Sequence, residues 1–254
     1  MSLSVIVITK NEAHNIQACL QSVAWCDEIV VVDSGSSDDT VSLARACGAQ
    51  VVQTADWPGY GPQKNVALSH ARSDWVLSID ADERVTPALR DEILTAMACG
   101  SHGAYRLPRL SRFCGRFIRH AGWYPEPVLR LFRRGEARFS DELVHERVVA
   151  KGSVGMLREP LMHYTYADYS EVLTKIDRYS TLGAQQAFER GKRATPWTAV
   201  VHGLWAFVRT YVFRAGFLDG AQGFGVALML GEASYYKYIK LWYLHRDAGN
   251  KREG

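Results

Sequence analysis

The sequence lacks the features that define several common protein classes. Its five cysteines, Cys19, Cys26, Cys47, Cys99 and Cys114, are odd in number and form no CxxC pair. This pattern excludes a structural zinc framework and predicts reduced thiols in the cytosol. The N-terminus has no charged segment followed by an apolar one, so no secretory signal is expected. No recognised nucleic-acid-binding motif occurs, and we expect no nucleic-acid partner.

Long apolar runs are also missing. The longest nearly apolar segment, residues 197–213, has 17 residues and contains His202 and Arg209. Crossing a bilayer takes about 20 predominantly apolar residues, so this segment is marginal as a membrane span. Aromatic residues with basic neighbours fill residues 196–244, which is typical of helices that lie in the lipid interface. A helical hairpin that closes the core, or a dimer interface, would explain the same composition.

Charge is divided unevenly along the chain. Residues 1–100 contain 6 Lys and Arg against 13 Asp and Glu, whereas residues 101–254 contain 24 against 14. The acidic part suits a ligand neutralised by a metal, and the basic part suits an anionic partner such as phosphate or a membrane surface. With 254 residues, the chain is long enough for one large domain with an appendage.

Short apolar runs alternate with helical patterns in the first hundred residues. The runs at 4–8, 28–32 and 50–53, and the run that begins at Trp75, are typical of buried parallel strands. A helix is expected after each of them, the first one capped by Asn11 or Asn15. Right-handed crossovers place the loops that follow parallel strands at one rim of the sheet, so we expect the polar residues of these loops to converge.

The run from Trp75 ends in three acidic side chains, Asp80, Asp82 and Glu83. They repel one another, so a cation is expected among them. Mg²⁺ or Mn²⁺ meets that need, because such ions are held by one or two carboxylates together with substrate phosphates. The alternative is a solvated loop that caps the helix near Pro87.

Two more rim positions have residues suited to a nucleotide. Asp33 can accept hydrogen bonds from a base or a ribose; alternatively, Asp33 and Ser36 form an Asx turn and cap the helix that begins at Thr40. Lys64 follows a loop rich in glycine and proline and lies near a helix N-terminus, which suits a diphosphate. The alternative for Lys64 is a solvated surface lysine.

Four segments, SVIVITKNE, IVVVDSGSSDDT, QKN and IDADE, in this order and spacing, resemble the family 2 glycosyltransferases with the GT-A fold. The resemblance covers residues 1–100 and extends more loosely to about residue 165. It implies an α/β fold with a mostly parallel sheet between helices, a nucleotide-sugar donor, a divalent metal and inversion at the anomeric carbon. We expect a catalytic domain at 1–165 and an amphipathic helical, membrane-associating extension at 166–254.

The resemblance also assigns the donor site. It implies that Thr9, Glu12 and Asp33 hold the nucleoside and that Lys64 contacts the diphosphate. The family usually has arginine at the position of Lys64, so the charge is kept while the bidentate fork of arginine is lost. Asp80 would contact the ribose.

The metal site follows from the same resemblance. Asp82 would bind the ion, Asp80 would belong to its ligand shell, and His163 would complete the shell. A neutral imidazole suits Mn²⁺ better than Ca²⁺. We therefore expect Mg²⁺ or Mn²⁺ as the cofactor.

Inverting transfer needs a carboxylate that takes the proton from the acceptor hydroxyl. The family supplies it from an acidic pair past the metal motif, and here His145-Glu146 stands in its place. We expect Glu146 to be the general base, with Asp141 and Glu142 as alternatives. A surface glutamate without a catalytic role is the other reading.

Within the family, the chain looks most like bacterial enzymes that add glucose to the inner core of lipopolysaccharide. This implies transfer from UDP-glucose to a heptose of a lipid A–core acceptor, by a peripheral protein on the cytoplasmic face of the inner membrane. Arg130 and Arg133 would lie on the acceptor side. A polyprenyl phosphate acceptor, a nucleotidylyltransferase and an inactive nucleotide-binding scaffold are the alternatives. A nucleotidylyltransferase is expected to have a glycine-rich loop directly after the first strand, and the sequence has none there.

Overall fold

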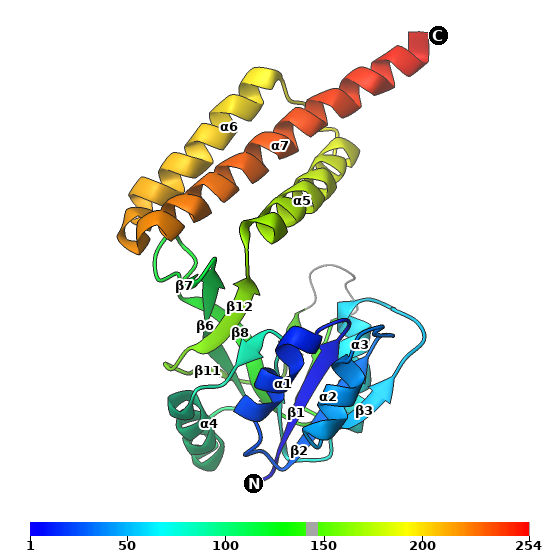
Figure 1. Cartoon of the computed structure of the whole chain (residues 1–254), viewed down its shortest axis with the longest axis vertical. Coiled ribbons are helices and arrows are strands. Elements are labelled where there is room, and N and C mark those ends of the chain that lie inside the picture. Colours follow the sequence, from blue (N-terminus) through cyan, green and yellow to red (C-terminus); the bar gives the residue numbers. More distant parts are fainter. Residues whose placement is uncertain (141–146, 254) are drawn as a thin grey trace. The chain divides into compact units, whose positions relative to one another are not determined.

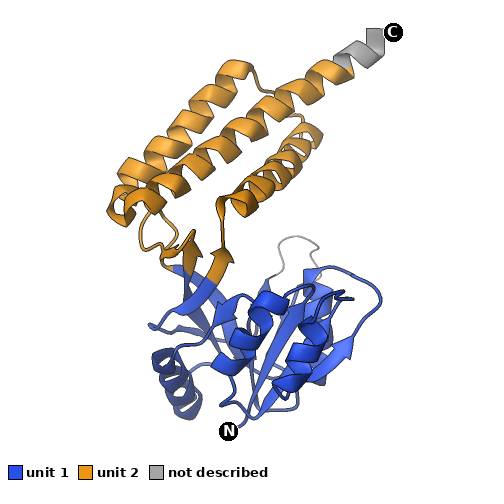
Figure 2. Ribbon diagram, viewed as in Figure 1, with its two compact units in different colours: residues 1–110, 126–163 blue, residues 111–125, 164–254 orange. Residues whose placement is uncertain are grey.

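The computed structural model describes residues 1–140 and 147–253, with side chains as far as residue 248. The three candidate bases Asp141, Glu142 and Glu146 lie outside the described residues. The chain divides into two compact units (Figure 2). Unit 1 consists of residues 1–110 and 126–163, and unit 2 of residues 111–125 and 164–254.

Four parallel strands form the first part of the main sheet (Figure 1). In order across the sheet they are β3 (Gln50–Gln53), β2 (Glu28–Asp33), β1 (Leu3–Thr9) and β4 (Trp75–Ser78). The central strands β1, β2 and β4 are almost entirely buried, as expected of strands covered on both faces. All four predicted strands are confirmed.

Antiparallel strands extend the sheet beyond β4. β8 (Glu126–Arg133) pairs with β4, and β6 (Ala104–Phe113) pairs with β8. The order continues through β12 (Leu161–Tyr166) to β5 (Glu83–Arg84). The predicted α/β class with the GT-A arrangement is confirmed, and the sheet is mixed because no crossover helix separates β6 from β8.

Helices α1 (Ala13–Ser22), α2 (Thr40–Ala46) and α3 (Tyr60–His70) connect the parallel strands, and α4 (Pro87–Cys99) follows β5. The predicted cap of the first helix is wrong. Glu12 precedes α1 and makes no side-chain cap bond. Asn11 instead has a positive φ of 55° and accepts a hydrogen bond from Ser37 N at 2.8 Å, so tertiary contacts take the place of a local cap.

Short strands complete the β structure. β9 (Ala137–Phe139) and β10 (Val148–Ala150) form a separate antiparallel pair. β11 (Val154–Met156) runs parallel to β6, and β7 (Arg116–Phe117) runs antiparallel to it.

Unit 2 is largely helical. Its helices are α5 (Tyr169–Glu189), α6 (Pro196–Val208) and α7 (Gly220–Glu253), and between the last two lie a π-helical turn, η1 (Arg209–Phe213), and a 3-10 turn, η2 (Gly216–Asp219). α7 packs against both α5 and α6 (Figure 1). The predicted helical C-terminal extension is confirmed. In the part of the chain that the structure describes, no helix combines the length and the apolar character that a membrane span requires.

Candidate active site

The loops after β1 and β2 are joined by hydrogen bonds at the carboxyl ends of the two strands. Asn11 N donates to Ser36 Oγ at 2.8 Å, and Glu12 N donates to Thr40 Oγ1 at 2.8 Å. Ala13 N donates to an oxygen of the Asp38 carboxylate at 3.1 Å. These bonds hold the start of α1 against the loop that follows β2, so the rim of the sheet has a defined shape.

Asp33 ends β2 directly beside Thr9, its partner in the parallel register. The side chain is fully buried, and its carboxylate accepts hydrogen bonds from Gly35 N at 3.0 Å and Ser36 N at 2.9 Å. The Asx turn considered for Asp33 is therefore present. Such a turn holds the carboxylate in one orientation at the strand end.

Two buried oxygen atoms near this strand end have no hydrogen-bond partner among the described residues: Thr9 Oγ1 and Gln63 Oε1. The amide nitrogen of Gln63 is used, because it donates to Ser34 Oγ at 2.9 Å and to Thr54 Oγ1 at 2.7 Å. A buried polar atom without a partner costs about 1–3 kcal/mol.

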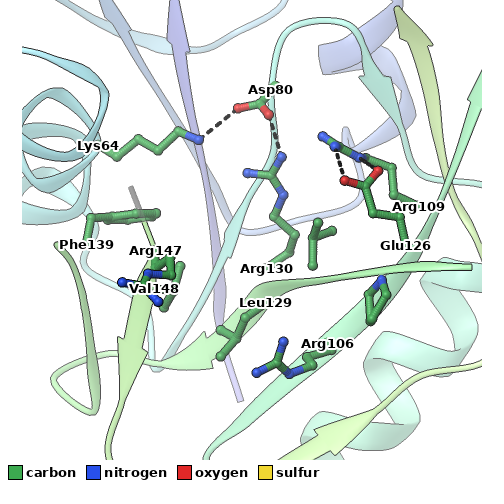
Figure 3. A pocket seen from close by; sticks show the side chains of 12 residues that line it. Lys64, Asp80, Arg106, Arg109, Glu126, Leu129, Arg130, Phe139, Arg147 and Val148 are labelled. Atoms are coloured by element: carbon green, nitrogen blue, oxygen red, sulfur yellow. Dashed lines mark hydrogen bonds and ion pairs between the residues drawn. The ribbon is translucent and has the colours of Figure 1, made fainter. Parts of the chain in front are cut away.

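A cluster of buried charges lies at the end of β4 (Figure 3). Lys64 Nζ lies 3.1 Å from Asp80 Oδ1, and the guanidinium of Arg130 donates to the other oxygen of the same carboxylate. Lys64 comes from α3 and Arg130 from β8. The side chains of Lys64 and Arg130 are buried, whereas about a third of the Asp80 side chain, 32%, is exposed.

Glu83 also belongs to this cluster. It is completely buried, its carboxylate lies 2.9 Å from Arg130 Nη2 and 3.5 Å from Arg109 Nη1, and it accepts a hydrogen bond from Asp80 N at 2.9 Å. Arg109 in turn binds Glu126 through two hydrogen bonds of 3.0 and 2.8 Å. Glu83 thus holds two arginines and the backbone of Asp80 in place.

The cluster determines the protonation state of its members. Burial by itself raises the pKa of the Asp80 carboxyl, but the charges of Arg130 and Lys64 outweigh burial and hold that pKa far below its ordinary value. Burial by itself lowers the pKa of Arg130, and the charges of Asp80 and Glu83 raise it above its ordinary value. Asp80 is therefore a carboxylate and Arg130 a cation throughout the physiological range.

A cavity of about 530 Å³ opens beside the cluster (Figure 3). Its basic lining residues are Lys64, Arg106, Arg109, Arg130 and Arg147, and its acidic ones are Asp80 and Glu126. The excess of positive charge suits an anionic ligand. Phe139 and Leu129 add apolar surface, which suits the faces of a sugar or a base.

Asp82 and His163 form a separate pair. Their nearest atoms, Asp82 Oδ2 and His163 Nε2, are 3.2 Å apart, because β5 and β12 pair in a register that sets His163 opposite Glu83. Burial raises the pKa of the nearby Glu12 carboxyl, Asn15 lowers it and the charge of Asp82 raises it further. Among the described residues, no three His, Cys, Asp or Glu side chains are grouped to hold a metal ion.

The structure brings together most of the predicted site residues that it describes. Thr9 and Asp33 are neighbours, Lys64, Asp80 and Arg130 form one cluster, and Asp82 lies against His163. Arg133 is not part of this group. Its guanidinium lies over the ring of Trp75, 5.1 Å from the ring centroid, at the start of β4 and not at its end.

The sequence alone assigned no role to Gln63, and it did not predict that Glu83 and Arg109 contact one another. Gln63 belongs to the QKN segment, but its burial and its two hydrogen bonds depend on how α3 packs. The sequence groups Glu83 with Asp80 and Asp82 around an expected cation, and the cations that the structure places against Glu83 are Arg130 and Arg109. Arg109 is one of five arginines spaced by three or four residues, Arg106, Arg109, Arg112, Arg116 and Arg119, which as a group suit an anionic acceptor. Only the strand register shows which of them reaches Glu83.

The Asp80 cluster predicts a particular dependence of stability on pH. A carboxyl whose pKa is lower in the folded chain gives up its stabilisation as the pH falls below its unfolded value of about 3.9. Between about pH 5 and pH 3, the free energy of unfolding should therefore fall more steeply for the wild type than for Asp80→Asn. Urea denaturation at a series of pH values measures this. Equal slopes for the two proteins would contradict the pairing of Asp80. The control is Asp91→Asn, at an exposed position on α4, whose stability should depend on pH as that of the wild type does.

The fold and the site together define a class of protein. An α/β sheet that presents carboxylates and a basic cavity at the carboxyl ends of parallel strands is the arrangement of an enzyme that binds an anionic, phosphate-bearing ligand. The family model described as "Glycosyl transferase family 2" matches residues 4–164. The chain belongs to this family and is a glycosyltransferase.

Known proteins similar to the chain include two bacterial relatives along most of its length. The lipopolysaccharide core biosynthesis glycosyltransferase LpsC of Rhizobium meliloti is 32% identical, over 96% of this chain and 93% of its own. An uncharacterized glycosyltransferase of Rickettsia prowazekii is 30% identical, over 94% of this chain and 86% of its own. A solved glucosyl-3-phosphoglycerate synthase of Mycobacterium tuberculosis, with Mn²⁺ and UDP, is 28% identical over 44% of each chain, with a TM-score of 0.38.

Proposed function

We propose that the protein transfers a hexose, glucose from UDP-glucose, onto a heptose of the lipopolysaccharide inner core, with inversion at the anomeric carbon. Membership of the family supports sugar transfer. The similarity to LpsC, which is named for lipopolysaccharide core biosynthesis and is matched along nearly its whole length, supports this acceptor class. The observation that carries the proposal is the cluster of Lys64, Asp80 and Arg130 beside the Asp82–His163 pair.

The donor would lie across the ends of β1, β2 and β4. Thr9 and Asp33, which are neighbours at the ends of β1 and β2, would lie beside the nucleoside, and Glu12 would complete this part of the site. Lys64 is a cation at the same rim and would attract the diphosphate. Because Lys64 is paired with Asp80, the donor's phosphates would compete with that carboxylate for the lysine.

The residues present fit a divalent metal as a partial ligand set. Asp82 and His163 offer a carboxylate oxygen and an imidazole nitrogen 3.2 Å apart, and Asp80 is the nearby carboxylate of the same turn. Mg²⁺ and Mn²⁺ are commonly held by one or two carboxylates with substrate phosphates supplying further ligands. Bound there, such an ion would neutralise the charge of the leaving diphosphate.

The acceptor would enter the basic cavity. Arg106, Arg109 and Arg147 line it and would attract phosphates or carboxylates of a core oligosaccharide. Glu146 remains the proposed general base on the grounds of its position in the sequence, with Asp141 and Glu142 as alternatives. Since the acceptor is attached to lipid A, the enzyme would work as a peripheral protein on the cytoplasmic face of the inner membrane.

A thermal-shift screen of nucleotide sugars with Mn²⁺ tests the donor assignment. UDP-glucose at 100 times its dissociation constant should stabilise the fold by about 2.7 kcal/mol, a readily measured shift. GDP- and ADP-sugars serve as controls for the base, and Asp91→Asn, which changes an exposed carboxylate on α4, should keep the full response. Absence of a shift with every UDP-sugar would contradict the proposed donor.

A further inference from the structure

Helix α6 has its small residues on the inside and its large apolar residues on the outside. Its buried positions are Ala199, Gly203 and Ala206, followed by Thr210 in η1. Gly203 lies against α7, where a Cβ atom would come within 3.1 Å of the Gly231 carbonyl oxygen. Close approach of the two helices therefore requires small residues on the side of α6 that faces α7. The large apolar residues of α6 lie on the opposite side.

The outward face is apolar and extends beyond α6. The exposed fractions are 74% for Trp197, 63% for Leu204 and 53% for Trp205. The same pattern continues in η1 with Phe213, exposed by 70%, and in η2 with Phe217 and Leu218. Exposed apolar residues repeated over adjoining elements mark a surface that binds a partner or a membrane.

The charges on this stretch all have one sign at the surface. Arg209 and Arg214 are exposed. Asp219 is the only acidic residue between positions 190 and 231, and it is buried. Its carboxylate accepts hydrogen bonds from Arg119 N at 3.1 Å and His120 N at 2.7 Å. The outward face thus presents cations and apolar groups without an exposed carboxylate.

These charges favour lipid over a second copy of the chain. A contact between two copies through this face would place Arg209 and Arg214 in an interface to which residues 190–231 contribute no exposed carboxylate. Anionic lipid headgroups supply the missing charge, and the acyl region accepts the aromatic and aliphatic side chains.

We propose that the outward face of α6, η1 and η2 lies embedded in one leaflet of a bilayer that contains anionic lipids, with Arg209 and Arg214 at the headgroups. α6 has 13 residues. With the five residues of η1, which follow α6 without a break, its length of about 27 Å is still shorter than the hydrocarbon core of about 30 Å, so this helical run lies along the surface. This inference deepens the membrane part of the proposed function and is independent of the transfer reaction.

Flotation with vesicles of phosphatidylethanolamine and phosphatidylglycerol tests it on the full-length protein. The wild type should float with these vesicles. Leu204→Ser/Phe213→Ser should lower the partition coefficient at least about tenfold, because two large apolar side chains are lost. Arg209→Gln should weaken binding to these vesicles and leave the weaker binding to phosphatidylcholine vesicles unchanged.

The matched control changes two exposed residues on α5, Leu173→Ser/Tyr179→Ser, which are 52% and 60% exposed. This variant should float like the wild type. Thermal unfolding and the response to UDP-glucose should be unchanged in Leu204→Ser/Phe213→Ser, which separates a failure of lipid binding from a failure of the donor assignment.

Three results would overturn the proposal. The first is wild-type protein that stays with the soluble fraction in the presence of anionic vesicles. The second is a Leu204→Ser/Phe213→Ser variant that floats as well as the wild type. The third is a wild-type dimer in analytical ultracentrifugation that this variant converts to a monomer, which would make the face a contact between copies.

Discussion

Replacing Asp82 with asparagine is expected to reduce glycosyl transfer about a thousandfold, the loss typical of a principal electrostatic contact in the transition state. Asparagine keeps the size of the side chain and removes the charge that would bind the metal. The Asp82–His163 pair places a carboxylate and an imidazole 3.2 Å apart at this rim. Turnover measured over a Mn²⁺ titration should show both the lower rate and weaker metal dependence.

The control for this experiment is Asp91→Asn, which removes an exposed carboxylate on α4 and should retain full activity. Circular dichroism and the melting temperature establish that Asp82→Asn is folded. If Asp82→Asn kept wild-type turnover with an unchanged Mn²⁺ requirement, the metal would have to bind elsewhere, and the donor site proposed here would lose its central element.

Replacing Arg130 with methionine is expected to lower the free energy of unfolding by about 3 kcal/mol, the lower end of the cost of breaking a buried ion pair. Arg130 contacts Asp80 and Glu83, and Glu83 is completely buried. Methionine fills much of the same space but leaves the buried Glu83 carboxylate with only Arg109, at 3.5 Å, as a cationic partner among the described residues. Denaturation in guanidinium chloride measures the change.

Arg106→Met is the matched control, because Arg106 lines the same cavity on β6 and is exposed. It should change the stability by less than about 0.5 kcal/mol. The double variant Arg130→Met/Glu83→Gln should regain part of the lost stability, since the uncompensated charge is removed. A loss below about 1 kcal/mol in Arg130→Met, with no recovery in the double variant, would contradict a structural role for the cluster.

The acidic residues and the arginines of the site differ in how well they could be predicted. Asp80, Asp82 and Lys64 follow strands or open helices, so the topology of parallel strands alone places them at one rim. Arg130 and Arg109 lie on antiparallel strands far along the chain, and their contacts depend on the pairing of β8 with β4 and β6. Local sequence carries little information about such a register, which is why Arg130 and Arg133 could not be told apart.

Local signals also failed at the first helix. Asn11 has the right residue type for a cap, yet it adopts a positive φ and binds the loop after β2. At α4 a local cap is present: Thr86 accepts a hydrogen bond from Leu89 N, and Pro87 occupies the first turn. The difference is that Thr86 bonds to its own helix, whereas Asn11 lies where two loops meet.

The sequence by itself determined the order of strands and helices in the first hundred residues, the family and the acidic rim, because these depend on apolar periodicity and on residues close together in the chain. Only the tertiary structure decided that Glu83 and Arg130 form an ion pair next to Asp80. It also decided that Thr9 and Gln63 have unsatisfied buried oxygens, and that α6 exposes its large side chains. These features arise from contacts between distant segments, whose geometry is set by packing.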